Sequence, residues 1–179
     1  MRTLIGFLSL AVLLMAATPA SSDPGVTDTS VKVGMIADLT GPIAFVGQEA
    51  TAGARIYLQH INEQGGVHGR KIELIVEDDG YQPPRTIAAF RKLVDRDRIF
   101  CFVGNIGSPT TVATFPFVKR ERIPLILPLS GATPMTTPPK RYVFGWDPSY
   151  AMHSWIIVKY IREIQKAPSA RLAILYQDD

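Results

Sequence analysis

The amino-acid sequence predicts an α/β fold: an open, mostly parallel sheet with helices on both faces. Short apolar runs of strand type alternate with segments of helical periodicity, turn signals rich in glycine and proline separate them, and no internal repeat breaks this order. The 179 residues, 46% hydrophobic and 20% charged, are enough to bury a core. We therefore expect a globular domain and not a disordered chain.

The first 22 residues differ from the rest of the chain. A cationic start at Arg2 is followed by a continuous apolar run and by small residues up to Ala20. This pattern is typical of a cleaved secretory signal, and Pro19 breaks the run before it could comfortably span a membrane. We expect a signal peptide at residues 1–22, a linker at 23–30 and an exported remainder.

Charge and cysteine usage exclude several classes of protein. Without Arg2 the formal charge is 18 basic against 16 acidic residues, so no electrostatic field for nucleic acid is expected. The only cysteine, Cys101, lies inside an apolar run, which predicts a buried and inert thiol and no intramolecular disulfide. Because no cysteine stands directly after the signal, we expect a soluble chain without a lipid anchor.

The first half of the chain contains two predicted strands around a helix. Residues 31–37 form the first strand and residues 71–76 the second. Gly65 and Gly66 end the helix between them. Its expected inner face consists of Ala50, Ala54, Leu58 and Ile61.

The middle of the chain repeats this alternation. Pro83 begins a helix whose inner side carries Ile87, Phe90 and Val94, and residues 99–103 form the third strand. Ser108 is expected to cap the next helix, with Pro109 in its first turn. Within that helix Pro116 predicts a kink or an early end.

Residues 123–127 and 142–146 are two further short strands. A longer helix is expected to begin near Ser149. Its apolar residues recur every four positions, at Met152, Ile156, Tyr160 and Ile164. Residues 171–176 read as a last strand with no helix to cover it. A strand of such a sheet is usually followed by a crossover, so we expect the chain to be a fragment.

Two short loops carry the most informative residues. Gly-Asn-Ile-Gly-Ser-Pro-Thr-Thr at 104–111 and Leu-Ser-Gly-Ala-Thr at 129–133 each follow an apolar run of strand type. Glycine allows a sharp turn, and the hydroxyl groups stand where a helix begins and its amide hydrogens lack partners. On neighbouring strands, two such loops would form a pocket of neutral donors for a small carboxylate, which favours binding over catalysis.

Six segments, in this order along the chain, carry a family resemblance. They are residues 37–42, Gly47, 61–69, 77–80, 104–111 and 128–132. From about Val31 to the last residue, the chain resembles the periplasmic substrate-binding proteins of branched-chain amino acid ABC transporters. The resemblance implies two α/β lobes around a hinge with substrate in the cleft between them, and residues 31–179 resemble the first lobe, with the chain ending before the second.

The resemblance also implies site residues. Ser108 matches the serine whose hydroxyl meets the substrate carboxylate, Val46 a residue that lines the apolar pocket, and Tyr150 lies near a cleft position. The loop that holds the carboxylate and the ammonium matches Ser130, Gly131, Ala132 and Thr133. The acidic partner of the ammonium belongs to the second lobe in that family.

The sequence departs from the family at two places. Tyr81 and Gly107 occupy positions that form a disulfide in some members, so that bridge is absent here. Val46 stands where leucine-binding relatives have an aromatic residue, which leaves the side chain of the substrate open.

The implied function is the periplasmic solute-binding component of an ABC transporter, without catalysis or cofactor, which binds a branched-chain amino acid or a similar small carboxylate and docks on a membrane permease. A ligand sensor is one alternative. An exported hydrolase using Ser108 or Asp78 is another, although Ser108 lacks the Gly-x-Ser-x-Gly elbow.

Several residues have structural interpretations. Ser108 could serve only as a helix cap, and Thr110 and Thr111 are expected to be first-turn residues. Asp78 and Asp79 are expected to organise a turn, since no ligand set at metal spacing surrounds them. Surface positions are expected for Tyr81, His60, His68 and His153, and core positions for Trp146 and Trp155.

Overall fold

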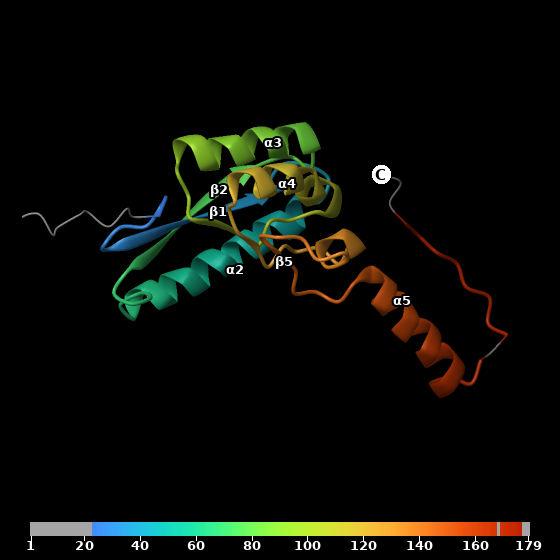
Figure 1. Ribbon diagram of the computed structural model, residues 1–179. Coiled ribbons are helices and arrows are strands. Elements are labelled where there is room, and N and C mark those ends of the chain that lie inside the picture. Colours follow the sequence, from blue (N-terminus) through green and yellow to red (C-terminus); the bar gives the residue numbers. More distant parts are fainter. Residues whose placement is uncertain (1–22, 168, 177–179) are drawn as a thin grey trace, which may run out of the picture.

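A computed structural model describes residues 23–167 and 169–176 (Figure 1). Its five strands form a sheet in the order β2-β1-β3-β4-β5, and every adjacent pair is parallel. The strands are β1 (Ser30–Ala37), β2 (Lys71–Asp78), β3 (Cys101–Val103), β4 (Leu125–Ile126) and β5 (Val143–Phe144). The predicted parallel α/β sheet is therefore confirmed, with β3, β4 and β5 shorter than their apolar runs. The predicted signal peptide lies outside the described residues.

Helices cover both faces of the sheet (Figure 1). The α-helices are α2 (Ala44–Glu63), α3 (Pro83–Arg91), α4 (Ser108–Glu121) and α5 (Tyr150–Lys159). Shorter turns are the π-helical η1 (Lys92–Arg96) and η3 (Tyr160–Ile164) and the 3-10 turn η2 (Thr133–Met135). One face packs against α2, while α3 and α4 cover the other.

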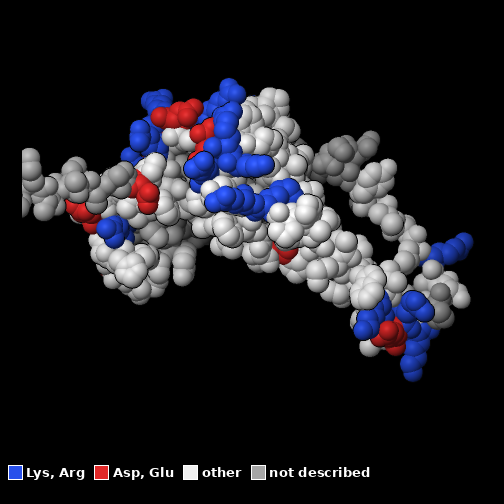
Figure 2. Space-filling model, in the orientation of Figure 1, with Lys and Arg blue, Asp and Glu red and all other residues white. Residues whose placement is uncertain are grey.

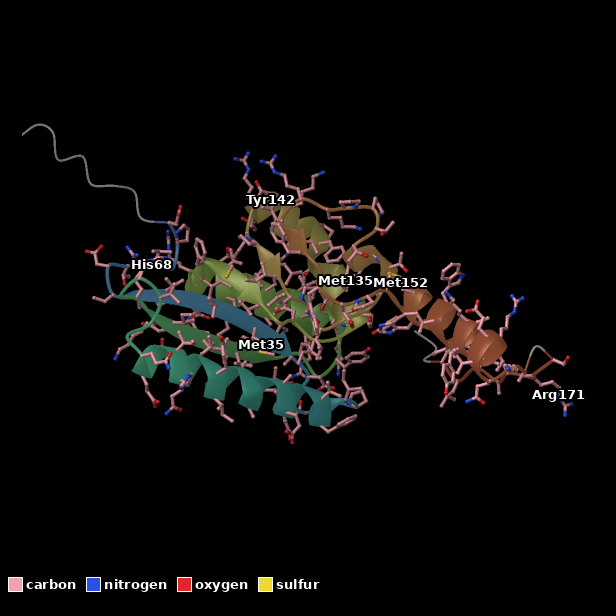
Figure 3. The ribbon with its side chains drawn as sticks, turned by 90° about the horizontal axis from the view of Figure 1, so that it is seen from below. Met35, His68, Met135, Tyr142, Met152 and Arg171 are labelled. Carbon is pink, nitrogen blue, oxygen red and sulfur yellow. The ribbon has the colours of Figure 1, made fainter. Side chains whose placement is uncertain are left out.

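Alternation along β1 divides the core between these two layers. Ile36 points into the larger cluster with Phe90 of α3 and Val118 of α4. Met35 and Ala37 point the other way, toward the inner face of α2. Figure 3 shows Met35 between the sheet and this helix. A strand presents successive side chains to opposite faces, so β1 packs against both helical layers.

The register of β1 and β2 brings their carboxyl ends together. Ala37 lies opposite Asp78, so the loops that follow the two strands start at the same edge of the sheet. Gly47 allows α2 to approach this edge closely, because a Cβ there would overlap the carbonyl oxygen of Asp38. The carboxyl edge is therefore where the first two loops meet.

The structure differs from the expectations in two places. Helix α4 continues to Glu121, so it does not end at Pro116, which lies on the exposed side of the helix. Residues 171–176 form no strand, so that prediction is wrong. They lie away from the sheet without a pairing strand, and Ile174 and Leu175 are exposed (Figure 1).

Helix α5 begins as predicted, with the Ser149 side chain accepting a hydrogen bond from the Met152 amide at 3.3 Å. None of its residues is buried, so its expected apolar face has no partner among the described residues. Figure 1 shows α5 extending away from the sheet. A search of the described residues finds no helix with the length and apolar character needed to cross a membrane.

Candidate ligand site at the carboxyl edge of the sheet

The two glycine-containing loops run side by side. Ile106 and Leu129 form a parallel bridge, and the Leu129 amide donates to the Asn105 carbonyl at 2.8 Å. The buried side chain of Asn105 fixes this pair to the sheet, because its Oδ1 accepts the Ile36 amide of β1 at 3.0 Å. The prediction that the loops are neighbours is confirmed.

Ser108 is the first residue of α4, and Gly107 takes the cap position with a φ of 100°. The predicted capping role of Ser108 is therefore wrong, because no side chain caps this helix. The Ser108 hydroxyl oxygen instead lies 2.8 Å from that of Ser130 and 3.5 Å from the Tyr150 hydroxyl. Pro109 has no N–H and the Thr111 amide donates to the Gly107 carbonyl at 3.1 Å, so the free amides of the first turn are those of Ser108 and Thr110. The dipole of this 14-residue helix favours an anion at this end.

Gly131 positions Tyr150. The Tyr150 amide donates to the Gly131 carbonyl at 2.7 Å, and a Cβ on Gly131 would lie 2.5 Å from the Tyr150 ring. Only a residue without a side chain lets the ring come this close. Gly131 therefore supports the hydroxyl of Tyr150 beside Ser108 and does not itself line the pocket.

A pocket of about 310 Å³ opens in front of these residues. Four predicted site residues line it, namely Val46, Ser108, Ser130 and Tyr150. The remaining lining consists of Ile43, Tyr81, Ile106, Gly107, Leu129 and Asp147. Asp147 is the only charged residue of this described lining, so the pocket combines apolar walls with hydroxyl groups and one carboxylate.

Ala132 and Thr133 do not line this pocket. Ala132 packs partly against the core, and Thr133 is exposed at the start of η2. The helix expected near Thr133 is a single three-residue 3-10 turn, too short for the aligned peptide dipoles of α4. A ligand contact by either residue stays a prediction.

Sequence reasoning missed Asp147 and preferred a surface position for Tyr81 over one in the cleft. Tyr81 is half-buried and packs over Gly107, where a Cβ would lie 2.6 Å from its ring, so the surface interpretation is wrong. Its place three residues after Asp78, at the edge where β1 and β2 end together, was the available signal. Asp147 follows β5 in the same way, three residues after Phe144.

Asp78 organises the loops that follow β1 and β2. Its carboxylate accepts the amides of Leu39 at 2.8 Å and Gly80 at 3.0 Å, the Thr40 hydroxyl at 2.7 Å and an Arg85 N–H at 2.8 Å. Desolvation opposes ionisation, but these hydrogen bonds together lower the pKa of Asp78 to about 2. The predicted turn role is confirmed.

Asp79 is fully buried and has the opposite shift. Burial raises its pKa, the negative charges of Asp38 and Asp78 add to this, and hydrogen bonds from the Thr86 hydroxyl and the Tyr81 amide offset part of it. The Tyr81 amide donates to Asp79 Oδ1 at 2.9 Å, and the Tyr81 side chain lines the pocket. Asp79 therefore holds the backbone of the pocket residue Tyr81.

The described part of the chain offers no catalytic constellation in this pocket. No histidine lines it, and all three histidines are exposed, as predicted. Among the described residues, no cluster of His, Cys, Asp and Glu could hold a metal ion. Ser108 therefore has no histidine partner of the kind that activates a serine nucleophile.

The predicted core positions of both tryptophans are wrong. Trp146 is 55% exposed and donates its indole N–H to the Pro128 carbonyl at 3.1 Å, next to the second loop. Trp155 is 77% exposed on α5. Both lie in apolar runs, but the described residues supply no layer to cover them.

Comparison with known proteins gives a family match over most of the chain. A family model described as periplasmic binding protein matches residues 30–179. A leucine-, isoleucine-, valine-, threonine- and alanine-binding protein of Pseudomonas aeruginosa is 28% identical over 160 residues, covering 89% of this chain and 41% of that protein. A Leu/Ile/Val-binding protein homolog of Brucella suis is 26% identical over 177 residues, covering 96% and 42%.

Solved structures show the same fold. A possible leucine/isoleucine/valine-binding protein from Rhodopirellula baltica has a TM-score of 0.71 at 24% identity and covers 82% of this chain and 38% of that one. A fatty acid ABC transporter substrate-binding protein from Thermomonospora curvata has a TM-score of 0.67 at 26% identity, covering 85% and 36%. The chain spans about two fifths of the length of the curated relatives it matches.

Proposed function

The chain belongs to the periplasmic binding protein family, and on that premise we propose that it binds a small apolar amino acid in the periplasm for import by an ABC transporter. The observation that carries the proposal is the Ser108–Ser130 hydroxyl pair at the start of α4, beside a pocket with apolar walls. Relatives named for leucine, isoleucine and valine binding support it.

The carboxylate of the ligand would bind at the hydroxyl pair. Ser130 Oγ accepts the Ala132 amide at 3.1 Å, so its own proton can be donated to Ser108, whose proton then remains for an anion. The amide groups at the start of α4 add donors, and the helix dipole adds a favourable potential. Neutral donors can hold a carboxylate in this way without an arginine.

The ammonium group would face Asp147. This half-buried carboxylate is the only charged group of the described lining, and it lies in the same pocket as the two serines. A zwitterion then has a donor cluster for one end and an acceptor for the other. Asp147 would act in addition to the acidic residue that the family resemblance assigns to a second lobe.

The side chain of the ligand would pack against the apolar wall. Ile43, Val46, Ile106 and Leu129 offer aliphatic surface of the kind that a branched side chain can cover. Val46 leaves more room than an aromatic residue would, which is compatible with several branched side chains. The pocket therefore favours leucine, isoleucine or valine over a strongly polar amino acid.

The rest of the transport cycle follows from the same proposal. This lobe would cover one side of the ligand, a second lobe would close over the other side, and a membrane permease would receive the solute. The 179-residue chain is therefore expected to bind its ligand weakly. No catalytic step is part of this function.

A titration with leucine analogues tests the proposal. Leucine, and 4-methylpentanoate, which lacks the ammonium group, are each titrated into the 179-residue chain and followed by NMR, which detects weak binding. We expect leucine to bind more tightly, and Asp147→Asn to remove most of this difference. Asp28→Asn, an exposed substitution away from the pocket, serves as the control. Equal binding of both compounds would disprove the role of Asp147, and no binding of either would disprove the proposed function.

A further inference from the structure

Nine basic residues gather at the edge of the sheet opposite the pocket. In a parallel sheet the helices end, and the next strands begin, at the same edge. The end of α3 with η1, the end of α4 and the segments leading into β3, β4 and β5 all meet there. This basic end consists of Arg91, Lys92, Arg96, Arg98, Lys119, Arg120, Arg122, Lys140 and Arg141.

The charge of the chain is divided unevenly. Residues 91–141 contain these nine basic residues and three acidic ones, Asp95, Asp97 and Glu121, a formal charge of +6. The remainder of residues 23–179 contains nine basic and thirteen acidic residues, a formal charge of −4. Figure 2 shows Lys and Arg side chains gathered over the surface of α3 and α4. The small net charge is therefore the sum of a strongly basic segment and an acidic remainder.

Few of these cations are neutralised within the protein. Lys92 pairs with Glu77 and Arg120 with Glu121, and the other seven make no ion pair within the described part of the chain. Arg91 and Arg120, from α3 and α4, both lie over the Phe117 ring, 5.6 and 5.1 Å from its centroid. One aromatic ring therefore contacts both guanidinium groups, and that of the exposed Arg91 makes no ion pair among the described residues.

Helix dipoles explain only part of this cluster. A cation in the last turn of α3 or α4 interacts favourably with the carboxyl end of its helix. Lys140 and Arg141 lead into β5 and follow only the short turn η2. Lys140 instead donates to the carbonyls of Pro134 and Pro138, at 2.8 and 3.1 Å. An external partner accounts for the whole set better than the dipoles do.

The chain enters the described structure at this same end. Asp23 and Pro24 border a hollow of about 540 Å³ that Arg98 and Arg122 also line. Gly25 packs so closely there that a Cβ would lie 2.6 Å from the Arg98 carbonyl oxygen. The described chain therefore begins beside the basic end.

From this arrangement we propose that the basic end binds the surface of an anionic phospholipid bilayer. Lipid phosphates would be held by the unpaired Lys and Arg side chains, while the pocket at the opposite edge stays open to solution. Surface electrostatics of this kind is strong at low salt and falls within a Debye length. The inference depends on the charge distribution and not on the identity of the solute.

Vesicle binding tests the proposal. The purified 179-residue chain is mixed with phosphatidylcholine vesicles, with and without about 30% phosphatidylglycerol, and bound protein is measured by flotation. The neutral vesicles measure what the signal segment contributes by itself. Arg96→Gln with Lys119→Gln removes two exposed, unpaired charges, and Arg55→Gln with Lys71→Gln is the matched control at the α2–β2 side.

We expect tighter binding to the anionic vesicles and loss of this gain at about 0.5 M salt. The Arg96→Gln, Lys119→Gln variant should bind the anionic vesicles about 25-fold more weakly, which is about fivefold for each charge removed. The control variant should bind them about as tightly as the unaltered chain. Equal binding to both kinds of vesicle, or an equal loss in the control pair, would overturn the proposal. Salt-sensitive binding to an acidic protein with no preference for anionic lipid would overturn it in favour of a protein partner.

Discussion

The hydroxyl oxygens of Ser108 and Ser130 lie 2.8 Å apart, although 22 residues separate them in the chain. The bond forms because the Ile106–Leu129 bridge holds their two loops side by side. Because Ser130 Oγ accepts the Ala132 amide, the Ser130 hydroxyl is free to donate to Ser108, and in that arrangement each hydrogen bond polarises the next. Such a row of hydrogen bonds ends in a hydroxyl proton that is well suited to a carboxylate.

Replacing Gly131 should disturb the pocket without unfolding the protein. In Gly131→Ala the new Cβ would lie 2.5 Å from the Tyr150 ring and 3.0 Å from the Pro148 carbonyl oxygen, and Tyr150 is 52% exposed, so solvent leaves room for its ring to shift. We expect weaker leucine binding and a change in unfolding free energy below about 1 kcal/mol. Titration by NMR together with urea unfolding measures both. Unchanged leucine affinity would mean that the position of Tyr150 is unimportant for binding.

Two glycines of α2 should respond in opposite directions to the same substitution. A Cβ at Gly47 would overlap the Asp38 carbonyl, whereas a Cβ at Gly53 has nothing within 4 Å. Gly47→Ala should lower the unfolding free energy by about 1–3 kcal/mol or more, and Gly53→Ala should raise it by about 0.5–1 kcal/mol through helix propensity. Urea unfolding of both variants is the measurement, and equal effects would contradict the close packing of α2 on β1.

Asp78 should make stability depend on acid pH. Its pKa is lowered from 3.8 to about 2 in the folded protein, so its contribution is complete above about pH 4 and is lost as the pH falls toward 2. At pH 7, Asp78→Asn should cost about 1–2 kcal/mol, a value reduced by the partial exposure of this carboxylate.

Unfolding in urea over this pH range, with Glu73→Gln as an exposed control on β2, measures the effect of Asp78. The deficit of Asp78→Asn should shrink as the pH falls. A deficit that stays constant down to about pH 2 would show that the charge of Asp78 does not stabilise the loops.

Cys101 should resist alkylation in the folded protein. Cys101 is only 5% exposed, and this burial raises the pKa of its thiol to about 11, so little thiolate is present at neutral pH. We expect slow labelling by iodoacetamide in buffer and rapid labelling in urea, measured by mass spectrometry. Rapid labelling in buffer would show that β3 opens readily.

The sequence predicted elements better than it predicted contacts. Periodicity located β1, β2, α2 and α3 well, and the glycines indicated the two loops that lie together beside the pocket, because these signals are local. Tyr81 and Asp147 were missed, since their places in the pocket depend on loops that meet only when the sheet is formed.

The wrong predictions share a physical cause. Trp155 and residues 171–176 are apolar, and their pattern predicts burial, but it does not say against what. Thr133 was expected near a helix start because its hydroxyl follows a glycine turn after a strand, yet the chain makes only one 3-10 turn there. Burial and helix length depend on neighbours that composition does not reveal.

The most direct test of the account is whether Ser108 recognises the ligand carboxylate. Leucine, and isopentylamine, which lacks the carboxylate, are titrated by NMR into the 179-residue chain, into Ser108→Ala and into the control Ser154→Ala on α5. We predict that leucine binds more tightly to the unaltered chain, that Ser108→Ala lowers this preference about tenfold or more, and that Ser154→Ala preserves it. An undiminished preference for leucine in Ser108→Ala would contradict the account.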